Sequence, residues 1–217
     1  MTQLVPSKSL LALAHWRCST AEMYALVRQS EDPFQAWQLF VKQRNHLFKV
    51  HGQSPLDPGQ QASFRSLSYY PYDPAFRVIG HLDHDVETME LAIDLGEDGL
   101  LRLKRIATIN FELQSHPARL CLFWVQGYGG GLFLPFKDQT NQSKSFSGGR
   151  YLYDTIKGAD LGAGENKILL DFNFAYNPSC AYSPRWVCPL APEENNLYLP
   201  IDAGEKRFTA GEMDASK

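Results

Sequence analysis

The segment from Asn173 to Asn196 holds the densest set of residues that could carry chemistry. It is rich in Tyr and Asn, contains two cysteines, and has prolines that restrict its backbone, which predicts a long ordered loop. Functional residues gather on loops that a rigid scaffold positions. We expect polar side chains in and beside this loop to face a ligand: Asp171, Asn173, Tyr176, Asn177, Tyr182, Glu194 and Asn195. A self-contained loop, whose polar groups satisfy its own backbone, is the alternative.

Cys180 and Cys188 lie in this loop with seven residues between them. Cys180 is a candidate nucleophile, and Asp171 and Glu194 are further catalytic candidates. The last histidine is His116, so an imidazole base would have to come from a distant strand. The two cysteines could instead ligate a metal, although a structural zinc site needs closer pairs and two more ligands. A disulfide between them would require an oxidising compartment.

A second candidate site surrounds Arg150. Asp138 ends one predicted strand, and two glycines, Gly148 and Gly149, deliver Arg150 to the start of the next. An arginine fixed at a strand start suits bidentate recognition of a carboxylate or phosphate. We therefore expect Arg150 and Asp138 at a ligand site that can accept an anion. The alternative is that Arg150 pairs with Asp138 or Asp171 and ties the loop to the sheet.

Two further motifs are less specific. The glycine-rich run Gly127–Gly131 is followed by an apolar strand and not by a helix, so it predicts a hairpin turn instead of a phosphate loop. His81, Asp83 and Asp85 would share one face of a strand and could bind a metal. A hydrated charged face at a sheet edge or turn is the commoner outcome for such residues.

The composition is that of an ordinary globular protein. The chain has 217 residues, 44% of them hydrophobic, with a net charge of −3 and four cysteines. These values exclude a collagen-like, disordered or disulfide-scaffold protein and give no electrostatic reason to expect nucleic acid. No run of about 18 apolar residues predicts a membrane span. The N-terminal apolar run is too short for a signal peptide, so a cytoplasmic location is expected.

The pattern of apolar residues predicts helices first and strands afterwards. Asp32 and Pro33 form a cap-then-proline signature that opens an amphipathic helix ending at Gly52, and Asp57–Pro58 repeats it. Lys42, Arg44 and Lys49 are assigned to the polar face of the first of these helices. Ser19–Gln29 predicts an earlier helix. About nine short strands follow: 68–70, 76–79, 88–94, 100–113, 120–125, 132–136, 151–153, 167–172 and 197–201.

This order predicts a mainly β protein. We expect an antiparallel β-sandwich or a partly closed β-barrel, with one or two helices at the N-terminus. The expected organisation is a helical appendage (1–56), an antiparallel β domain (57–208) and a flexible tail (209–217). Strands do not alternate regularly with helices, which argues against a parallel doubly wound sheet.

The chain resembles a bacterial and archaeal family called domain of unknown function 1684. Three blocks carry the resemblance: His51–Leu56 with Phe64 and Tyr69–Val78; Phe136, Asp138, Thr140 and Gly149–Leu152; and Leu170–Asn173, Ala175–Pro178, Cys180–Ser183, Cys188–Leu190, Glu194–Asn195 and Ala203–Lys206. Asn141 stands where the family usually has glycine, and Ser145–Phe146 where it usually has Thr-Tyr. The resemblance implies a shared fold and a shared site, without an assigned activity, substrate or cofactor.

The sequence therefore predicts an uncharacterised protein that binds a small ligand, or acts on it, in a pocket under the 173–196 loop. Whether it is an enzyme is left open, and no cofactor is indicated. One alternative is a protein-interaction or structural module in which the loop is a rigid cover. A metal-binding β-barrel is the other.

Overall fold

The computed structural model describes residues 7–209 and begins with three helices. They are α1 (Ser7–Gln29), α2 (Pro33–Val50) and α3 (Pro58–Ser63). The capping prediction for α2 is confirmed, because the Asp32 carboxylate accepts from the backbone N–H of Phe34 at 2.9 Å and of Gln35 at 3.1 Å. By contrast, α1 begins at Ser7 instead of Ser19. The apolar residues before Ser19 form a consecutive run (10–14) without an amphipathic stripe, so periodicity could not reveal these first turns of the helix.

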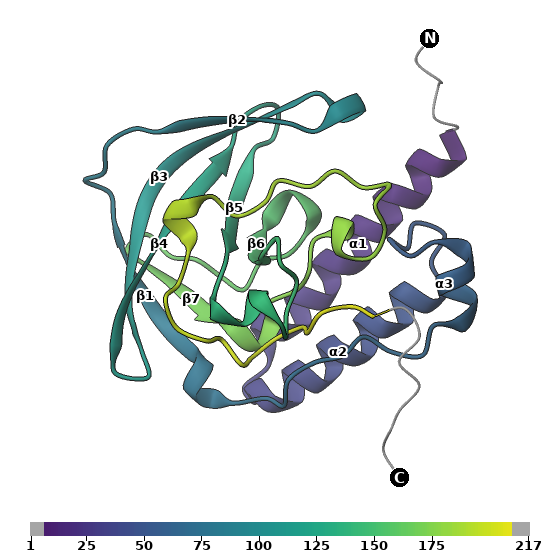
Figure 1. The fold of residues 1–217 in the computed structure, drawn as a ribbon, viewed down its shortest axis with the longest axis horizontal. Helices are drawn as coiled ribbons and strands as arrows, with labels where there is room; N and C mark the ends of the chain where they lie inside the picture. The colour runs from purple at the N-terminus through teal and green to yellow at the C-terminus, as the bar shows by residue number, and fades with distance from the viewer. Residues whose placement is uncertain (1–6, 210–217) are drawn as a thin grey trace.

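Seven antiparallel strands form one sheet that curls into a half-barrel (Figure 1). The strands are β1 (Arg77–Asp83), β2 (Glu90–Asp94), β3 (Leu100–Leu113), β4 (His116–Val125), β5 (Gly131–Phe136), β6 (Arg150–Asp154) and β7 (Lys167–Asp171). The order is β6-β5-β4-β3-β1-β7, with β2 paired to β3 off this path. The prediction of a mainly β fold with a partly closed barrel is confirmed, and the glycine-rich run 127–131 joins β4 to β5 as a turn.

The curl follows from the long strand β3. Its first residues, 100–104, pair with β2, whereas residues 108–110 pair with β1. Between these stretches the β3–β4 register shifts at Arg105/Ala107. A bulge of this kind bends a strand and increases its twist, so one strand can serve two differently oriented neighbours.

Two predicted strands are wrong. Neither segment forms a strand. In 68–70 there is one isolated bridge, between Tyr69 and Glu205, and beside 197–201 there is one between Asn196 and Lys137. Segment 195–199 runs beside 137–139 and exchanges single hydrogen bonds with it, without a continuous ladder. Apolar alternation alone could not separate this packed extended chain from a strand, because both bury alternate side chains.

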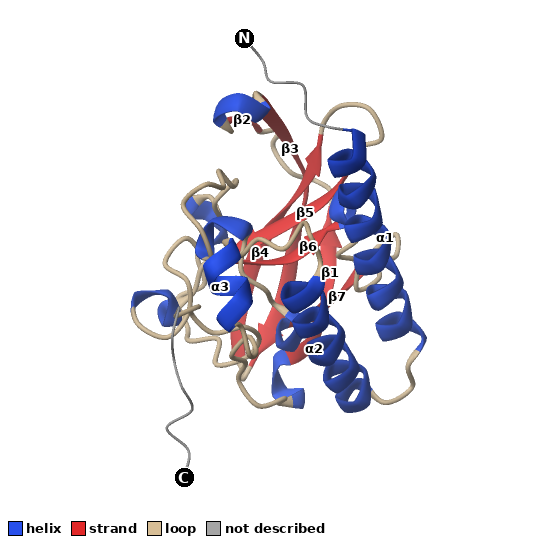
Figure 2. Ribbon diagram, turned by 90° about the vertical axis from the view of Figure 1, so that its right-hand side faces the viewer, coloured by secondary structure: helices blue, strands red, loops and turns tan. Residues whose placement is uncertain are grey.

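The helices and the sheet share one core. Met23 and Tyr24 of α1 and Ala36 and Phe40 of α2 lie in the same buried cluster as the side chains of β3 to β7. Figure 2 shows α1 and α2 side by side against the sheet, which is consistent with their many mutual contacts. None of the helices described in residues 7–209 is long and apolar enough to cross a membrane.

The predicted metal site on β1 lacks a ligand set. His81 and Asp83 lie on this strand, where His81 is exposed and pairs through its backbone with β3 and β7. Within residues 7–209, no three or more His, Cys, Asp or Glu side chains are grouped so that they could hold a metal ion.

Candidate functional site

The chain after β7 crosses the sheet as a long cover. We call residues 172–205 the cover segment; its only helical parts are the short turns η5 (Phe172–Phe174), η6 (Ser179–Ala181) and η7 (Glu193–Asn195). Figure 1 shows this segment, green to yellow, passing in front of β4, β5 and β6. All but three of the predicted site residues lie in it. The exceptions are Asp138, Arg150 and Asp171.

Asn195 fastens the cover segment between two strands. In the register of the β4–β5 ladder, Cys121 of β4 would lie opposite Pro135 of β5, two positions beyond the last pair, Phe123 with Phe133, but Pro135 has no N–H to donate. The Asn195 amide takes the place of the missing donor: its Nδ2 donates to the carbonyls of Cys121 (2.9 Å) and Pro135 (2.7 Å), and its Oδ1 accepts from Cys121 N (2.7 Å). Asn195 is fully buried. All of its hydrogen-bonding capacity is used inside the protein.

Arg150 is also fully buried, and its charge is neutralised by Asp138 at 2.8 Å. The guanidinium donates to the carbonyls of Ile201 (3.0 Å), Ala203 and Glu205 (3.3 Å) as well. Asp138 accepts the backbone N–H of Ile201 at 3.2 Å. The pair therefore ties the end of the cover segment to β6, and an external anion would have to displace Asp138 to reach Arg150.

Asp171 and Asn173 hold the start of the cover segment. Asp171 Oδ1 accepts from the backbone and side-chain nitrogens of Asn173 at 3.1 and 2.9 Å, and Oδ2 lies 3.3 Å from Nε of Arg77. Asn173 also exchanges two hydrogen bonds with the backbone of Asp73. Burial raises the pKa of Asp171 to about 6, against the opposing effects of the Asn173 hydrogen bonds and the half-exposed Arg77.

A buried network around Glu205 was missed at the sequence level. Arg44 lies 3.1 Å from Glu205, and both the Arg44 guanidinium and Glu205 contact the hydroxyl of Tyr182. Glu205 also accepts the backbone N–H of Asn177 at 3.1 Å. The guanidinium of Arg44 lies over the ring of Tyr176. The prediction that Arg44 faces solvent is wrong, since only 8% of it is exposed.

The spacing of α2 contained a signal for this error. Phe40 and Phe48 are buried, and Arg44 stands four residues from each, on the same helical face. A charged residue in the middle of an apolar stripe indicates a buried partner. The sequence gave no way to identify that partner as Glu205, which lies 161 residues further along the chain.

Cys180 and Cys188 are in direct contact. The backbone N–H of Cys180 donates to Cys188 Sγ at 3.3 Å. Both side chains are free thiols and partly exposed. The pKa of Cys188 is lowered to about 7, first by the neighbouring Cys180 thiol acting as a proton donor and then by backbone N–H groups and the positive charge of Lys157, although burial acts against it. The neighbouring Cys188 sulfur and partial burial raise the pKa of Cys180.

The residues between the two cysteines are anchored to the chain before and within α3. Trp186 Nε1 donates to Pro55 O at 3.0 Å, and Arg185 donates to Ser54 O and Leu56 O at 3.1 and 3.0 Å. On the other side, the hydroxyl of Tyr151 donates to the carbonyl of Pro189, next to Cys188. These contacts hold the two sulfurs together without a covalent bond.

The family model described as protein of unknown function (DUF1684) matches residues 62–206. The chain belongs to this family. The chain is also similar to an uncharacterised protein of Haloarcula marismortui, solved in solution by NMR, with 34% identity and a TM-score of 0.58. The match covers 79% of this chain and 92% of that one. No curated protein matches the chain.

In this DUF1684 protein the predicted site residues fall into several clusters and do not line one pocket. Asp171 meets Asn173, and Cys180 meets Cys188. Asn177, Tyr182 and Tyr176 gather around Glu205 and Arg44, and the Arg150–Asp138 pair reaches the backbone of Glu205. Asn195 and Glu194 lie elsewhere. Ligand contact by these residues stays a prediction. The buried clusters already have partners within the chain, so the partly exposed dithiol is the group most available for chemistry.

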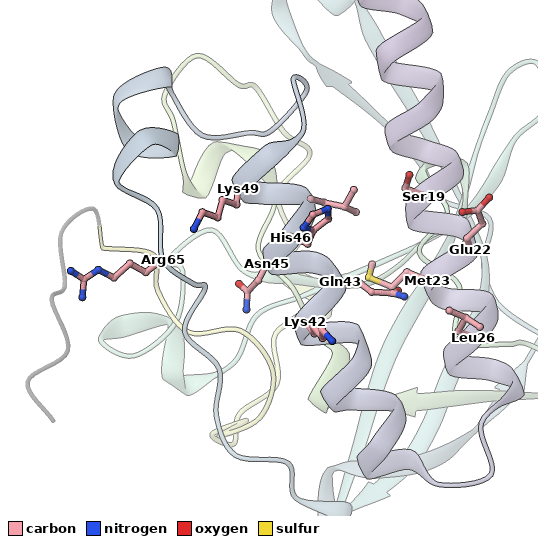
Figure 3. Close-up of a pocket in the computed structure, with 11 residues that line it drawn as sticks. Ser19, Glu22, Met23, Leu26, Lys42, Gln43, Asn45, His46, Lys49 and Arg65 are labelled. Atoms are coloured by element: carbon pink, nitrogen blue, oxygen red, sulfur yellow. The ribbon is translucent and has the colours of Figure 1, made fainter. Parts of the chain in front are cut away.

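Surface cavities lie at other places. Figure 3 shows a groove of about 560 Å³ between α1 and α2, where Met23 and Leu26 face Gln43 and His46. Asp171 lines a second cavity, of about 260 Å³, between the helices and β7. Exposed Glu194 lines a third, of about 390 Å³, beside the start of β4.

Proposed function

We propose that this DUF1684 protein is a thiol-based redox protein in which Cys180 and Cys188 cycle between dithiol and disulfide. The observation that carries this proposal is the hydrogen bond from the Cys180 backbone N–H to Cys188 Sγ at 3.3 Å, which brings the two cysteines of the anchored loop together. A disulfide between neighbouring cysteines held in this way would close a short loop whose ends already meet. In the cytoplasmic location expected from the sequence, the resting form is the dithiol.

The reaction needs a disulfide as oxidant. The Cys188 thiolate attacks one sulfur of R–S–S–R′, forms a Cys188–S–S–R mixed disulfide and releases R′S⁻. Cys180 then loses its proton to solvent or to the departing thiolate and attacks the Cys188 sulfur. The Cys180–Cys188 disulfide forms and RS⁻ leaves, so the protein is oxidised by two electrons and the substrate is reduced to two thiols.

The backbone geometry favours Cys188 as the attacking thiol, because its Sγ accepts the Cys180 N–H and a thiolate there would be stabilised. The pKa of Cys188 is lowered in the same direction, to about 7, and an attacking thiol reacts best when its pKa is near the ambient pH. The pKa of Cys180 is raised, which suits the thiol that resolves the mixed disulfide. The sequence named Cys180 as the candidate nucleophile; the geometry favours Cys188 for attack and Cys180 for resolution.

The proposal also gives the expected ligand a chemical class, a disulfide. It places the reaction at the surface of the cover segment and not beneath it. The closed contacts of Arg150 and Asn195 support a structural role for the rest of the segment, as in the rigid-cover alternative. Metal binding by the two cysteines is the third candidate, and native mass measurement distinguishes it from the redox function.

The test is to equilibrate the full chain with mixtures of reduced and oxidised glutathione and to map disulfides by peptide mass. We expect a Cys180–Cys188 disulfide in the wild type. C180S should accumulate glutathione on Cys188, because the resolving thiol is absent, and C188S should stay reduced at Cys180. C18S is the matched control, since Cys18 is an exposed thiol outside the pair.

The reactivity of Cys188 toward iodoacetamide should follow a titration near pH 7, below the ordinary range of a cysteine thiol. The proposal is contradicted if no Cys180–Cys188 disulfide forms at any glutathione ratio, or if alkylation of Cys188 follows the pH dependence of an ordinary thiol. Native mass measurement of the purified chain provides a further check. If the wild type carries a stoichiometric metal and the C180S/C188S double variant does not, the two cysteines bind a metal and the redox function is contradicted.

A further inference from the structure

The dithiol is bordered by exposed apolar side chains. Val187 precedes Cys188 and is 55% exposed, and Leu190, two residues after Cys188, is 44% exposed. Ile156, 38% exposed, adjoins Lys157, whose charge acts on the Cys188 sulfur. Single exposed apolar residues are common on proteins. Here two of them stand one and two residues from Cys188 in the chain and the third stands beside Lys157; we call the three the apolar border (Ile156, Val187, Leu190).

The charges near this border do not favour an anionic substrate. The ammonium of Lys157 is already paired with Asp154 at 3.2 Å. The turn η2 (Gly96–Asp98), between β2 and β3, approaches Val187 so closely that a Cβ added at Gly96 would lie 4.0 Å from the Val187 side chain. This turn carries Glu97 and Asp98. A small disulfide with several carboxylates, such as glutathione disulfide, would therefore gain little from these charges and would leave the apolar border exposed to water.

We propose that the partner of the dithiol is a polypeptide that presents a cysteine, as a disulfide, between apolar residues and without neighbouring acidic ones. This inference rests on the proposed redox function and names its substrate class. The partner's apolar neighbours would cover Val187, Leu190 and Ile156 while its sulfur reaches Cys188. Release of the partner follows when Cys180 attacks the mixed disulfide, which returns a free thiol on the polypeptide.

The test compares two synthetic peptides that carry the same thionitrobenzoate disulfide on their cysteine. One has leucine and valine beside the cysteine, and the other has glutamate and aspartate. The rate of thionitrobenzoate release by the reduced full chain measures attack on the disulfide. We expect the apolar peptide to react at least about tenfold faster, because covering half-exposed Val and Leu side chains stabilises the encounter.

V187S and L190S should each reduce the rate with the apolar peptide several-fold and leave the rate with glutathione disulfide unchanged. I79S is the matched control, since Ile79 of β1 is 48% exposed and pairs with Leu169 of β7, outside the segments that anchor the dithiol. Equal rates for the two peptides, or a preference that survives in V187S and L190S, would overturn the inference and leave the redox function standing. No disulfide formation with any of the three substrates would overturn both.

Discussion

A buried arginine has to be neutralised, and in this protein Asp138 neutralises Arg150 from within the chain. The type and position of Arg150 predicted a site that binds an anion. The guanidinium does bind a carboxylate, but the carboxylate belongs to Asp138. What the sequence could not specify is the source of the carboxylate. Asp138 stands 12 residues before Arg150, and the intervening 3-10 turn, which Asp138 itself caps, brings it back.

The dithiol was predictable only in part. Two cysteines in one loop raised the question, but seven intervening residues do not determine the distance between two sulfurs. That distance depends on long-range anchors, such as the hydrogen bond from Trp186 to Pro55, 131 residues away. The same limit applies to Arg44 and Glu205, whose positions in the sequence are equally uninformative about their contact.

Asp171 makes a pH-dependent contribution to stability. Its pKa is raised to about 6, so the folded protein binds the proton more tightly than the unfolded chain does. The stabilisation from the protonated acid is therefore present at low pH and is lost as the pH rises toward and through about 6. D171N cannot titrate. Between about pH 4 and pH 7 the wild type should lose about 2–3 kcal/mol of unfolding free energy relative to D171N.

Urea unfolding at several pH values measures this difference, with D98N, at an exposed turn, as the control. D98N should follow the wild-type profile. Parallel profiles for the wild type and D171N would show that Arg77 and Asn173 offset the cost of burying the carboxylate, against the prediction.

At the scale of elements, the sequence predicted what local physics decides. The Asp32–Pro33 cap determines where α2 begins, and alternation at both ends of β3, on either side of its bulge, predicts this strand. Local sequence does not decide whether 7–18 is helical or whether 197–201 is a strand, because both depend on the parts of the protein that pack against these segments. Asn195 shows this dependence most directly, because a proline in β5 removes a ladder donor and a side chain from a distant turn replaces it.

Replacement of Asn195 should therefore separate the cover segment from the sheet. N195A leaves the Cys121 N–H and the Cys121 and Pro135 carbonyls buried without a partner, which should cost about 2–4 kcal/mol. N195D should cost more, since it aims a buried carboxylate at two carbonyl oxygens. Urea unfolding measures both variants. N196A, next to it and only partly buried, is the control, and equal effects of N195A and N196A would contradict the bridging role.

The whole molecule is a curled sheet enclosed by two helices and by its own C-terminal chain, and these layers meet at Arg44. This residue of α2 reaches Glu205 of the cover segment, and its guanidinium lies over the ring of Tyr176, which pairs through its backbone with β6. Fold class could be predicted from the order of elements along the chain. The meeting point of the layers could not, because it joins residues that are far apart in sequence.

If Arg44 and Glu205 couple the layers, their variants should not act independently. R44M or E205Q alone leaves one buried group without its partner and should cost about 3–5 kcal/mol in unfolding free energy. The double variant should cost less than the sum, by about 1–3 kcal/mol, because neither charge is then stranded. The exposed pair Lys144–Asp202 is the control, where K144M and D202N should couple by less than about 1 kcal/mol. Additive effects at Arg44 and Glu205 would mean that α2 and the cover segment are held together by apolar packing alone.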